Sequence, residues 1–504
     1  MRNSNSVRRS IIGCVALLLA TSLYGEPGND DDPVELSPQE IVQIAGDSVV
    51  LIEVQGNAGS TQGTGFLVNS NGSIATCLHV IDGATSIVVS LRDGTRVEEV
   101  AVRAFDVQSD LALLAVDLPR DDSSWAVVEL GDSEAIEPGA PILVISNPMG
   151  LEHTATEGIV SAWRKPEDSE LQKPCGESPL KLALPQGGAL QISATISPGS
   201  SGAPVLNDRA EAIGVATSGV LWGMAGLNFA VPIDKLVVLL EQDDAMDLDS
   251  FGERVDDVRR DLARPHFEDS DLAYQGGEIV EARQCLERAL HLYPRYEEAL
   301  LLAGRIGIEI GQFDLAEQRL SFATALDEYN ADAWYYLGDV QQKKAIASND
   351  RARLSRAEVA FEKALAIDPW HGKAAYRLAL FQISRGQFER AKQLLILATD
   401  SEPGFADAYY MLGEIHHDQG RLDDSKEAFN QALREDESHA MSHLGLALLY
   451  LDIERRPNGT VEPYGRASSH LEEFLRLSEN DPALAADREL AARFIREYFP
   501  HILD

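Results

Sequence analysis

The stretch Ile196-Ser197-Pro198-Gly199-Ser200-Ser201-Gly202-Ala203-Pro204-Val205 is a loop of small residues and proline between two apolar runs. A serine hydroxyl attacks a carbonyl efficiently only where backbone N–H groups beside it point at the oxyanion that forms. Such a tight turn needs residues with little or no side chain, and Gly199 and Gly202 flank Ser201 in this way. We therefore predict that Ser201 is a catalytic nucleophile and that the N–H groups of Gly199 and Ser201 are the oxyanion donors. A merely flexible loop is the alternative.

Short runs rich in Val, Ile and Leu, separated by turn residues, extend on both sides of this loop. Asn71-Gly72 between two of them is a strong signal for a two-residue hairpin. Because no helical segment alternates with the runs, the pattern favours a β-barrel or a sandwich over a parallel sheet. The predicted strands are Val49–Val54, Gly65–Val68, Ile74–Cys77, Ser86–Leu91, Val97–Ala104, Leu111–Val116, Ile142–Ile145, Gly158–Trp163, Leu190–Ala194, Ala212–Thr217 and Asn228–Val231.

Two polar residues upstream can complete the chemistry of Ser201. His79 follows the strand that ends at Cys77, and Asp110 opens the strand that begins at Leu111. A general base must take the proton of the serine, and a buried carboxylate must hold that base in the right tautomer. We predict these roles for His79 and Asp110; Asp106 is a rival carboxylate. The chain order His, Asp, Ser is that of chymotrypsin-type enzymes.

Residues from about 40 to 240 resemble the protease domain of the HtrA/Deg family of trypsin-fold serine proteases. The resemblance implies two six-stranded β-barrels, with the triad His79, Asp110 and Ser201 in the cleft between them. It also implies polypeptide substrates, no cofactor and no metal. An esterase with the same triad is less favoured, because the strand–turn–helix elbow of those enzymes is absent. The matching blocks are Gly63–Val68, Thr76–Val80, Ser109–Leu114, Asn147–Gly150, Glu157–Ala162, Pro198–Val205 and Asn228–Pro232.

The sequence departs from the family pattern in three places. The family usually has Gly-Asn-Ser-Gly-Gly around its nucleophile, whereas this chain has Gly199-Ser200-Ser201-Gly202-Ala203. A long polar loop, Lys165–Gly188, precedes the strand before the nucleophile and is expected to border the cleft. No PDZ-like segment follows the protease-like region. These departures keep a second interpretation open, in which the protease domain is weak, gated or inactive and the protein is an envelope scaffold or chaperone.

The specificity pocket is expected to form around Thr195, Ala216, Thr217 and Ser218. No acidic residue stands at the base of the expected pocket, and the runs Leu190–Ile196 and Ala216–Val220 are small or apolar. A basic side chain at the cleavage site would find no countercharge there. We therefore expect small or aliphatic residues at the cleavage site.

The second half of the sequence is a repeat of helical pairs. We interpret the acidic segment 241–262 as a linker or a bridging helix. Residues 263–504 resemble a tetratricopeptide solenoid of about six repeats with a capping helix. Small residues at the helix crossings let paired helices approach closely, so the units must stack and form a groove for protein partners. The residues that carry this pattern include Gly277, Ala282, Gly304, Gly311, Trp334, Gly338, Phe361, Gly386, Gly413, Gly420 and Phe429.

Composition and the N-terminus indicate where the protein works. The chain has 504 residues and a formal net charge of -38, so nucleic acid is an unlikely partner. Three arginines precede the apolar run Ile11–Ala20, which is typical of a signal peptide over 1–25, followed by an acidic linker over 26–40. We expect a periplasmic or extracellular protein, with an uncleaved anchor as the alternative. The resemblance also allows a homo-oligomer.

The four cysteines, Cys14, Cys77, Cys175 and Cys285, form neither a disulfide framework nor a C-x-x-C metal site. We expect buried thiols, with a Cys77–Cys175 bridge as the alternative. Together, the sequence predicts an all-β protease domain, 41–240, followed by an all-α solenoid. The predicted function is an exported serine endopeptidase whose repeats recruit substrates or partners.

Overall fold

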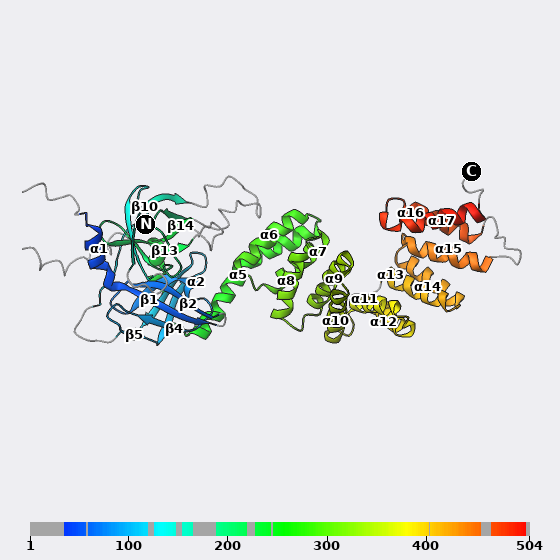
Figure 1. Ribbon diagram of the computed structural model, residues 1–504, viewed down its shortest axis with the longest axis horizontal. Coiled ribbons are helices and arrows are strands. Elements are labelled where there is room, and N and C mark those ends of the chain that lie inside the picture. Colours follow the sequence, from blue (N-terminus) through cyan, green and yellow to red (C-terminus); the bar gives the residue numbers. More distant parts are fainter. Residues whose placement is uncertain are drawn as a thin grey trace, which may run out of the picture. The chain divides into compact units, whose positions relative to one another are not determined.

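The computed structural model describes residues 35–56, 59–118, 125–147, 154–164, 188–218, 227–242, 245–402, 404–454 and 465–499. The chain divides into two compact units, a β-rich first unit up to Gly252 and a helical second unit from Glu253 (Figure 1). The expected signal peptide and the loop 165–187 lie outside the described residues. None of the described helices is long and apolar enough to cross a membrane.

The first sheet of the first unit is antiparallel. Six of its seven strands follow the predicted Val-, Ile- and Leu-rich runs, and the seventh is a two-residue edge strand. The run predicted as one strand over Val97–Ala104 is interrupted at Glu98 and Glu99 and forms two strands. Across the sheet the order is β5 (Arg96–Val97), β4 (Ala84–Ser90), β1 (Val49–Gly56), β2 (Gly59–Leu67), β3 (Ser73–Cys77), β7 (Leu111–Val116) and β6 (Val100–Asp106).

The second sheet closes into a barrel because its first strand, β12, also pairs with β13. A two-residue strand, β8 (Glu129–Leu130), runs parallel to β13 at the edge. The sequence pattern missed β12 and β8, which are too short to show a period. The order is β12 (Pro204–Leu206), β9 (Pro141–Ser146), β10 (Thr154–Arg164), β11 (Ala189–Ile192), β14 (Asn228–Pro232), β13 (Glu211–Ser218) and β8.

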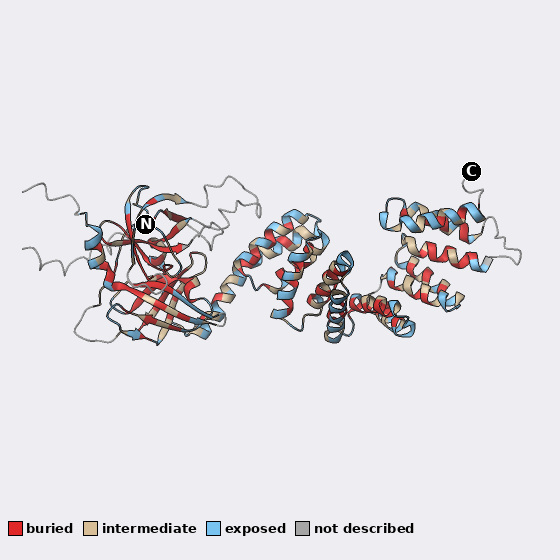
Figure 2. Ribbon diagram, in the orientation of Figure 1, coloured by how far each residue is buried: buried red, intermediate tan, exposed pale blue. Residues whose placement is uncertain are grey.

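Short helices accompany the strands. The helix α1 (Pro38–Ala45) begins within the segment expected to be a linker, where Ser37 and Glu40 form a capping box. The one-turn helix α2 (Leu78–Ile81) follows β3, and α4 (Ile233–Leu240) follows β14. Most of the strands of the first unit are coloured as buried (Figure 2). Buried apolar side chains of the second barrel form one cluster that includes Val144, Val160, Leu190, Val205 and Ala216.

The second unit is a stack of antiparallel helix pairs, as the repeat pattern predicted. Glycines allow the close crossings: a Cβ on Gly338 would lie 2.7 Å from the ring of Phe361, and one on Gly413 would lie 2.5 Å from that of Phe429. The helices are α5 (Leu248–Gln275), α6 (Ile279–Leu292), α7 (Glu297–Glu309), α8 (Phe313–Leu326), α9 (Ala331–Ser348), α10 (Arg351–Ile367), α11 (Gly372–Ser384), α12 (Phe388–Ser401), α13 (Ala406–Asp418), α14 (Leu422–Glu435), α15 (Ala440–Glu454), α16 (Arg466–Ser478) and α17 (Ala485–Tyr498).

The cysteines match the expectation of buried thiols at Cys77 but not at Cys285. Cys77 is buried and free, so the proposed Cys77–Cys175 bridge is wrong. Cys285 on α6 is disulfide-bonded, so it is not the buried thiol that the sequence suggested. The spacing of the cysteines carried no signal for this bond.

Two histidines near the C-terminal end of the solenoid face each other. His443 on α15 and His470 on α16 place their Nδ1 atoms 2.9 Å apart. Burial, together with the nearby charges of His443 and Arg466, lowers the pKa of His470 to about 4 from an ordinary 6.5. Between these two pH values the unfolded chain binds a proton that the folded chain does not bind. This pair therefore makes the folded state less stable as the pH falls from about 6.5 towards 4.

We predict that His470→Phe removes this pH dependence, because the phenyl ring can keep the stacking on Tyr450 and does not titrate. The midpoint of urea unfolding, followed by the helical circular dichroism signal, is measured for both proteins between pH 7.5 and 4.5. The midpoint of the variant, relative to that of the wild type, should increase as the pH falls. His417→Phe on α13 is the matched control. A difference between wild type and His470→Phe that is the same at every pH would contradict the assignment.

Candidate active site

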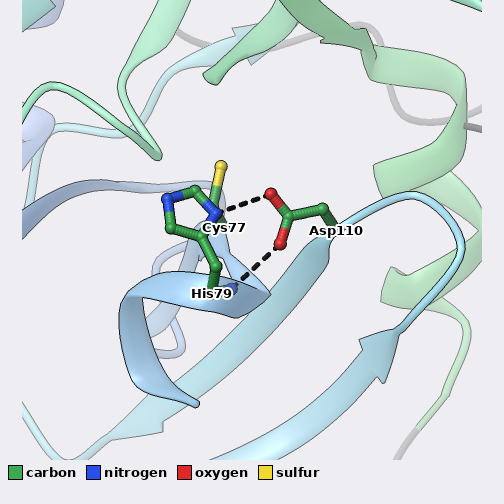
Figure 3. Close-up of side chains that lie close together, drawn as sticks. All are labelled: Cys77, His79 and Asp110. Atoms are coloured by element: carbon green, nitrogen blue, oxygen red, sulfur yellow. Dashed lines mark hydrogen bonds and ion pairs between the residues drawn. The ribbon is translucent and has the colours of Figure 1, made fainter. Parts of the chain in front are cut away.

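The structure brings His79 and Asp110 together in a two-point contact (Figure 3). His79 lies on α2 directly after β3, and Asp110 ends the turn between β6 and β7. The His79 Nδ1 atom is 2.6 Å from Asp110 Oδ2, and the backbone N–H of His79 donates to Asp110 Oδ1 over 2.9 Å. Because both carboxylate oxygens are engaged, the imidazole is fixed with Nε2 directed away from Asp110. This is the arrangement that a general base requires.

The backbone of Asp110 is held in an unusual conformation. Its φ angle is 57°, in the left-handed region that few residues other than glycine adopt. The carbonyl of Asp110 accepts a hydrogen bond from the N–H of Leu78 over 2.9 Å. The side chain of Asp110 is 16% exposed and that of His79 is 26% exposed. The pair is therefore partly shielded from water and still accessible to a substrate.

The rival carboxylate, Asp106, has a different task. Its Oδ2 accepts from the hydroxyl of Ser109 over 2.5 Å, and its Oδ1 accepts from the N–H of Gln108 over 3.0 Å. Asp106 therefore closes the turn that leads to Asp110. The geometry places Asp110 and not Asp106 beside His79.

Cys77 lies behind the His79–Asp110 pair and is fully buried. Its thiol donates to the carbonyl of Ala216 over 3.4 Å. Burial, and after it the charge of Asp110, raises the pKa of the Cys77 thiol well above its ordinary value. Potential ligand atoms of Cys77, His79 and Asp110 lie within 4.8 Å of one another, but Cys77 is held as a neutral thiol and the other two groups are bonded to each other.

The loop that carries Ser201, residues 196–203, is called the nucleophile loop here. It consists of tight turns and leads into the strand β12. Gly199 and Gly202 have φ angles of 93° and 91°, so both need the freedom of glycine. Ser201 lies between them and is 8% exposed. The N–H groups of Ser200, Gly202 and Ala203 are each hydrogen-bonded to backbone carbonyls. By contrast, within the described part of the chain the N–H groups of Gly199 and Ser201 donate no hydrogen bond and remain available for an oxyanion.

The first sheet supports this loop directly. The hydroxyl of Thr64 on β2 donates to the carbonyl of Gly199 over 2.7 Å and accepts from the N–H of Asn147 over 3.0 Å. The N–H of Thr64 donates to the carbonyl of Ser201 over 2.9 Å. A Cβ on Gly202 would lie 2.1 Å from the carbonyl oxygen of Thr64, so no larger residue fits there. Thr64 therefore fixes the carbonyls of Gly199 and Ser201, the two residues whose N–H groups have no acceptor among the described residues.

Ser201 and His79 are not hydrogen-bonded to each other among the described residues: Ser201 Oγ has no partner there. In enzymes without substrate, catalytic hydrogen bonds are often long and tighten only in the complex. Among the described residues, His79 and Asp110 are therefore hydrogen-bonded to each other, whereas Ser201 and His79 are not.

The residues predicted to line the specificity pocket fall into two groups. Thr195 is exposed, whereas Ala216 and Thr217 are fully buried behind the His79–Asp110 pair. The hydroxyl of Thr217 donates to Asp110 Oδ2 over 3.4 Å, so it supports the carboxylate. Ser218 pairs with Asn228 in the β13–β14 register, and its side chain lies outside the described residues. The contact between Thr217 and Asp110 joins residues 107 positions apart, so the sequence around either residue gives no signal of it.

Each of the two units matches a known protein family. Residues 63–215 match the profile described as a trypsin-like peptidase domain. Residues 270–318, 350–415 and 406–439 match profiles of the tetratricopeptide repeat. The chain carries a trypsin-like peptidase domain followed by tetratricopeptide repeats.

The peptidase domain is similar to proteins that are named as proteases. A protein of Halomonas elongata named "Probable periplasmic serine endoprotease DegP-like" is 33% identical over 209 residues, which are 40% of this chain and 40% of that protein. "Protease Do-like 1, chloroplastic" of Arabidopsis thaliana is 31% identical over 182 residues, 36% of this chain and 38% of that protein. The chain thus spans about two fifths of the length of the curated relatives it matches.

Among solved structures, the HtrA-type protease AlgW with tripeptide is 27% identical, with a TM-score of 0.34. The match covers 41% of this chain and 62% of that one. The serine endoprotease from Yersinia pestis is also 27% identical, with a TM-score of 0.33 and coverage of 42% and 67%.

The support of the nucleophile loop by Thr64 generates a prediction. Thr64→Val keeps the shape of the side chain but leaves the Gly199 carbonyl and the Asn147 N–H without their shared partner. Leaving each of these buried groups without a partner costs about 1–3 kcal/mol and displaces the loop that carries Ser201. We therefore expect the rate of fluorophosphonate labelling to fall by about tenfold or more. Thr85→Val, which removes an exposed hydroxyl on β4, is the matched control. Equal labelling rates for the two variants would contradict the role of Thr64.

Proposed function

We propose that this protein is an exported serine endopeptidase in which Ser201 is the nucleophile, His79 the general base and Asp110 the residue that orients His79. The observation that carries the proposal is the pairing of two features in one domain. The carboxylate of Asp110 holds His79 at two points, and the Gly199 and Ser201 N–H groups of the glycine-rich loop have no acceptor among the described residues. Acyl transfer needs both features.

The reaction then proceeds in two halves. Ser201 Oγ forms a bond to the peptide carbonyl carbon while His79 Nε2 accepts the hydroxyl proton. The carbonyl oxygen becomes an oxyanion, which the N–H groups of Gly199 and Ser201 stabilise. As the intermediate collapses, His79 returns the proton to the leaving amine and the C–N bond breaks. A water molecule, deprotonated by His79, hydrolyses the acyl-enzyme in the same manner.

Thr217 fits this mechanism as a supporting residue. Its hydroxyl is buried and donates to the same oxygen of Asp110 that binds His79. This contact helps to hold the carboxylate in place beside His79. Asp110 can therefore stabilise the imidazolium that forms at His79 during each half of the reaction.

The solenoid and the cellular location complete the proposal. Helix pairs stacked in this way form extended surfaces, and we propose that the repeats recruit polypeptide substrates or protein partners through their groove. A homo-oligomer is compatible with the proposal. Export follows from the leader-like N-terminus, and a similar protein is named as periplasmic. The substrates are proposed to be polypeptides with small or aliphatic residues at the cleavage site.

One observation favours a regulated site as the second candidate. Ser201 Oγ and His79 make no hydrogen bond with each other among the described residues, whereas a working triad needs this contact. In this alternative the domain rests until a substrate or partner engages it, or the protein acts as a scaffold.

The test is labelling of the purified full-length protein with a fluorophosphonate probe, read out by mass spectrometry of the tryptic peptides. We expect one adduct, on Ser201, and none in Ser201→Ala. Asp110→Asn should lower the labelling rate by about 10³- to 10⁴-fold, because the imidazole loses its orienting carboxylate. Ser197→Ala, a neighbouring serine in the same loop, is the matched control and should label like the wild type. Well-folded wild-type protein that never labels would contradict the proposed activity.

A further inference from the structure

The outer edge of β6 in the first sheet pairs at Val102 with Met246, which lies shortly before α5. β6 is the last strand in the sheet order. The N–H of Val102 on β6 donates to the carbonyl of Met246 over 3.0 Å, and the N–H of Met246 donates to the carbonyl of Val102 over 2.8 Å. This antiparallel bridge satisfies backbone groups that an edge strand would otherwise leave open.

A buried aromatic contact follows five residues later. Phe251, in the first turn of α5, is 1% exposed. Its ring meets that of Phe105 on β6 edge-on, with centroids 5.4 Å apart and an angle of 83° between the ring planes. Asp247 anchors this turn, since its carboxylate accepts from the N–H of Ser250 over 2.8 Å. The segment Met246–Phe251 therefore packs on β6 at two points, Val102 and Phe105.

The strand that receives these contacts leads directly to the catalytic carboxylate. Phe105 pairs with Ala112, and Asp106 pairs with Leu111, in the β6–β7 register. The turn between these strands is closed by Asp106 and ends at Asp110. Asp110 has a φ angle of 57°, and such a conformation persists only where the surroundings determine it. The position of β6 is therefore part of what holds Asp110 against His79.

We propose that the segment Met246–Phe251 is a positioning element of the active site, with Phe251 as its principal residue. It fixes β6, and through the β6–β7 turn it keeps the carboxylate of Asp110 within hydrogen-bond distance of His79. The inference rests on the proposed function in that Asp110 is the orienting carboxylate. It also means that the functional protease unit does not end with α4 at Leu240 but includes the start of α5, the helix in which the boundary to the second unit falls.

The test compares Phe251→Ala with Ile41→Ala in the full-length protein. Both remove a large buried apolar side chain from the first unit and are expected to destabilise it to a similar extent. Ile41 lies on α1, which packs against β9 of the second sheet. The first readout is the rate of fluorophosphonate labelling. The second is the far-downfield proton NMR signal of the His79 Nδ1–H that is shared with Asp110, which needs no catalytic activity.

We expect Phe251→Ala to lower the labelling rate by about 10- to 100-fold, as a small displacement of a catalytic group does, and to shift or broaden the downfield signal. Ile41→Ala should retain both. Phe251→Leu, which keeps much of the packing, should fold and give an intermediate loss.

Wild-type rates and an unchanged downfield signal in Phe251→Leu and Phe251→Ala would overturn the inference. Equal losses in Ile41→Ala would also overturn it, because the effect would then be one of general stability. A wild-type protein that shows the downfield signal but never labels would contradict the proposed function alone, since the NMR comparison still tests the role of Phe251.

Discussion

The two-point contact between Asp110 and His79 is the interaction on which the rest of the first unit depends. It joins a turn after β6 to a helix after β3, and Asp110 makes it from a left-handed backbone conformation. Several neighbours each supply one constraint: the N–H of Leu78 on the Asp110 carbonyl, the hydroxyl of Thr217 on its carboxylate, and the Asp106 turn before it. A strained residue is stable here because so many independent contacts agree on its position.

The nucleophile loop shows the complementary arrangement, in which two groups are kept free of partners. The N–H groups of Ser200 and Ala203 donate to carbonyls within the loop, that of Gly202 donates to Ala216 on β13, and Thr64 engages the loop's carbonyls from the first sheet. Among the described residues, the N–H groups of Gly199 and Ser201 have no acceptor, as the proposed oxyanion site requires. Both parts of the proposed active site therefore rely on contacts between the two sheets, at Thr64, Cys77 and Thr217. The solenoid, by contrast, is held by local repeats of small and aromatic residues.

Much of this could be predicted from the sequence, for identifiable reasons. Runs of Val, Ile and Leu are long enough to reveal most strands, and the repeating glycines and aromatics reveal the helix pairs. The strands β12 and β8 are too short for a period to appear, and α1 was missed although Ser37 and Glu40 carry its capping signal. Thr217 contacts Asp110, and Phe251 contacts Phe105, and in both pairs the two residues lie far apart along the chain. Such contacts leave no local pattern, so only the structure shows them.

The most direct measurement of the central claim is a crystal structure of the full-length protein with a peptidyl boronic acid, whose boron becomes tetrahedral when a serine attacks it. The account predicts a bond from Ser201 Oγ to boron. One boronate oxygen should accept from the N–H groups of Gly199 and Ser201, and His79 should remain bonded to Asp110 through Nδ1. A boronate attached elsewhere, or an oxygen turned away from these two N–H groups in an otherwise ordered site, would contradict it.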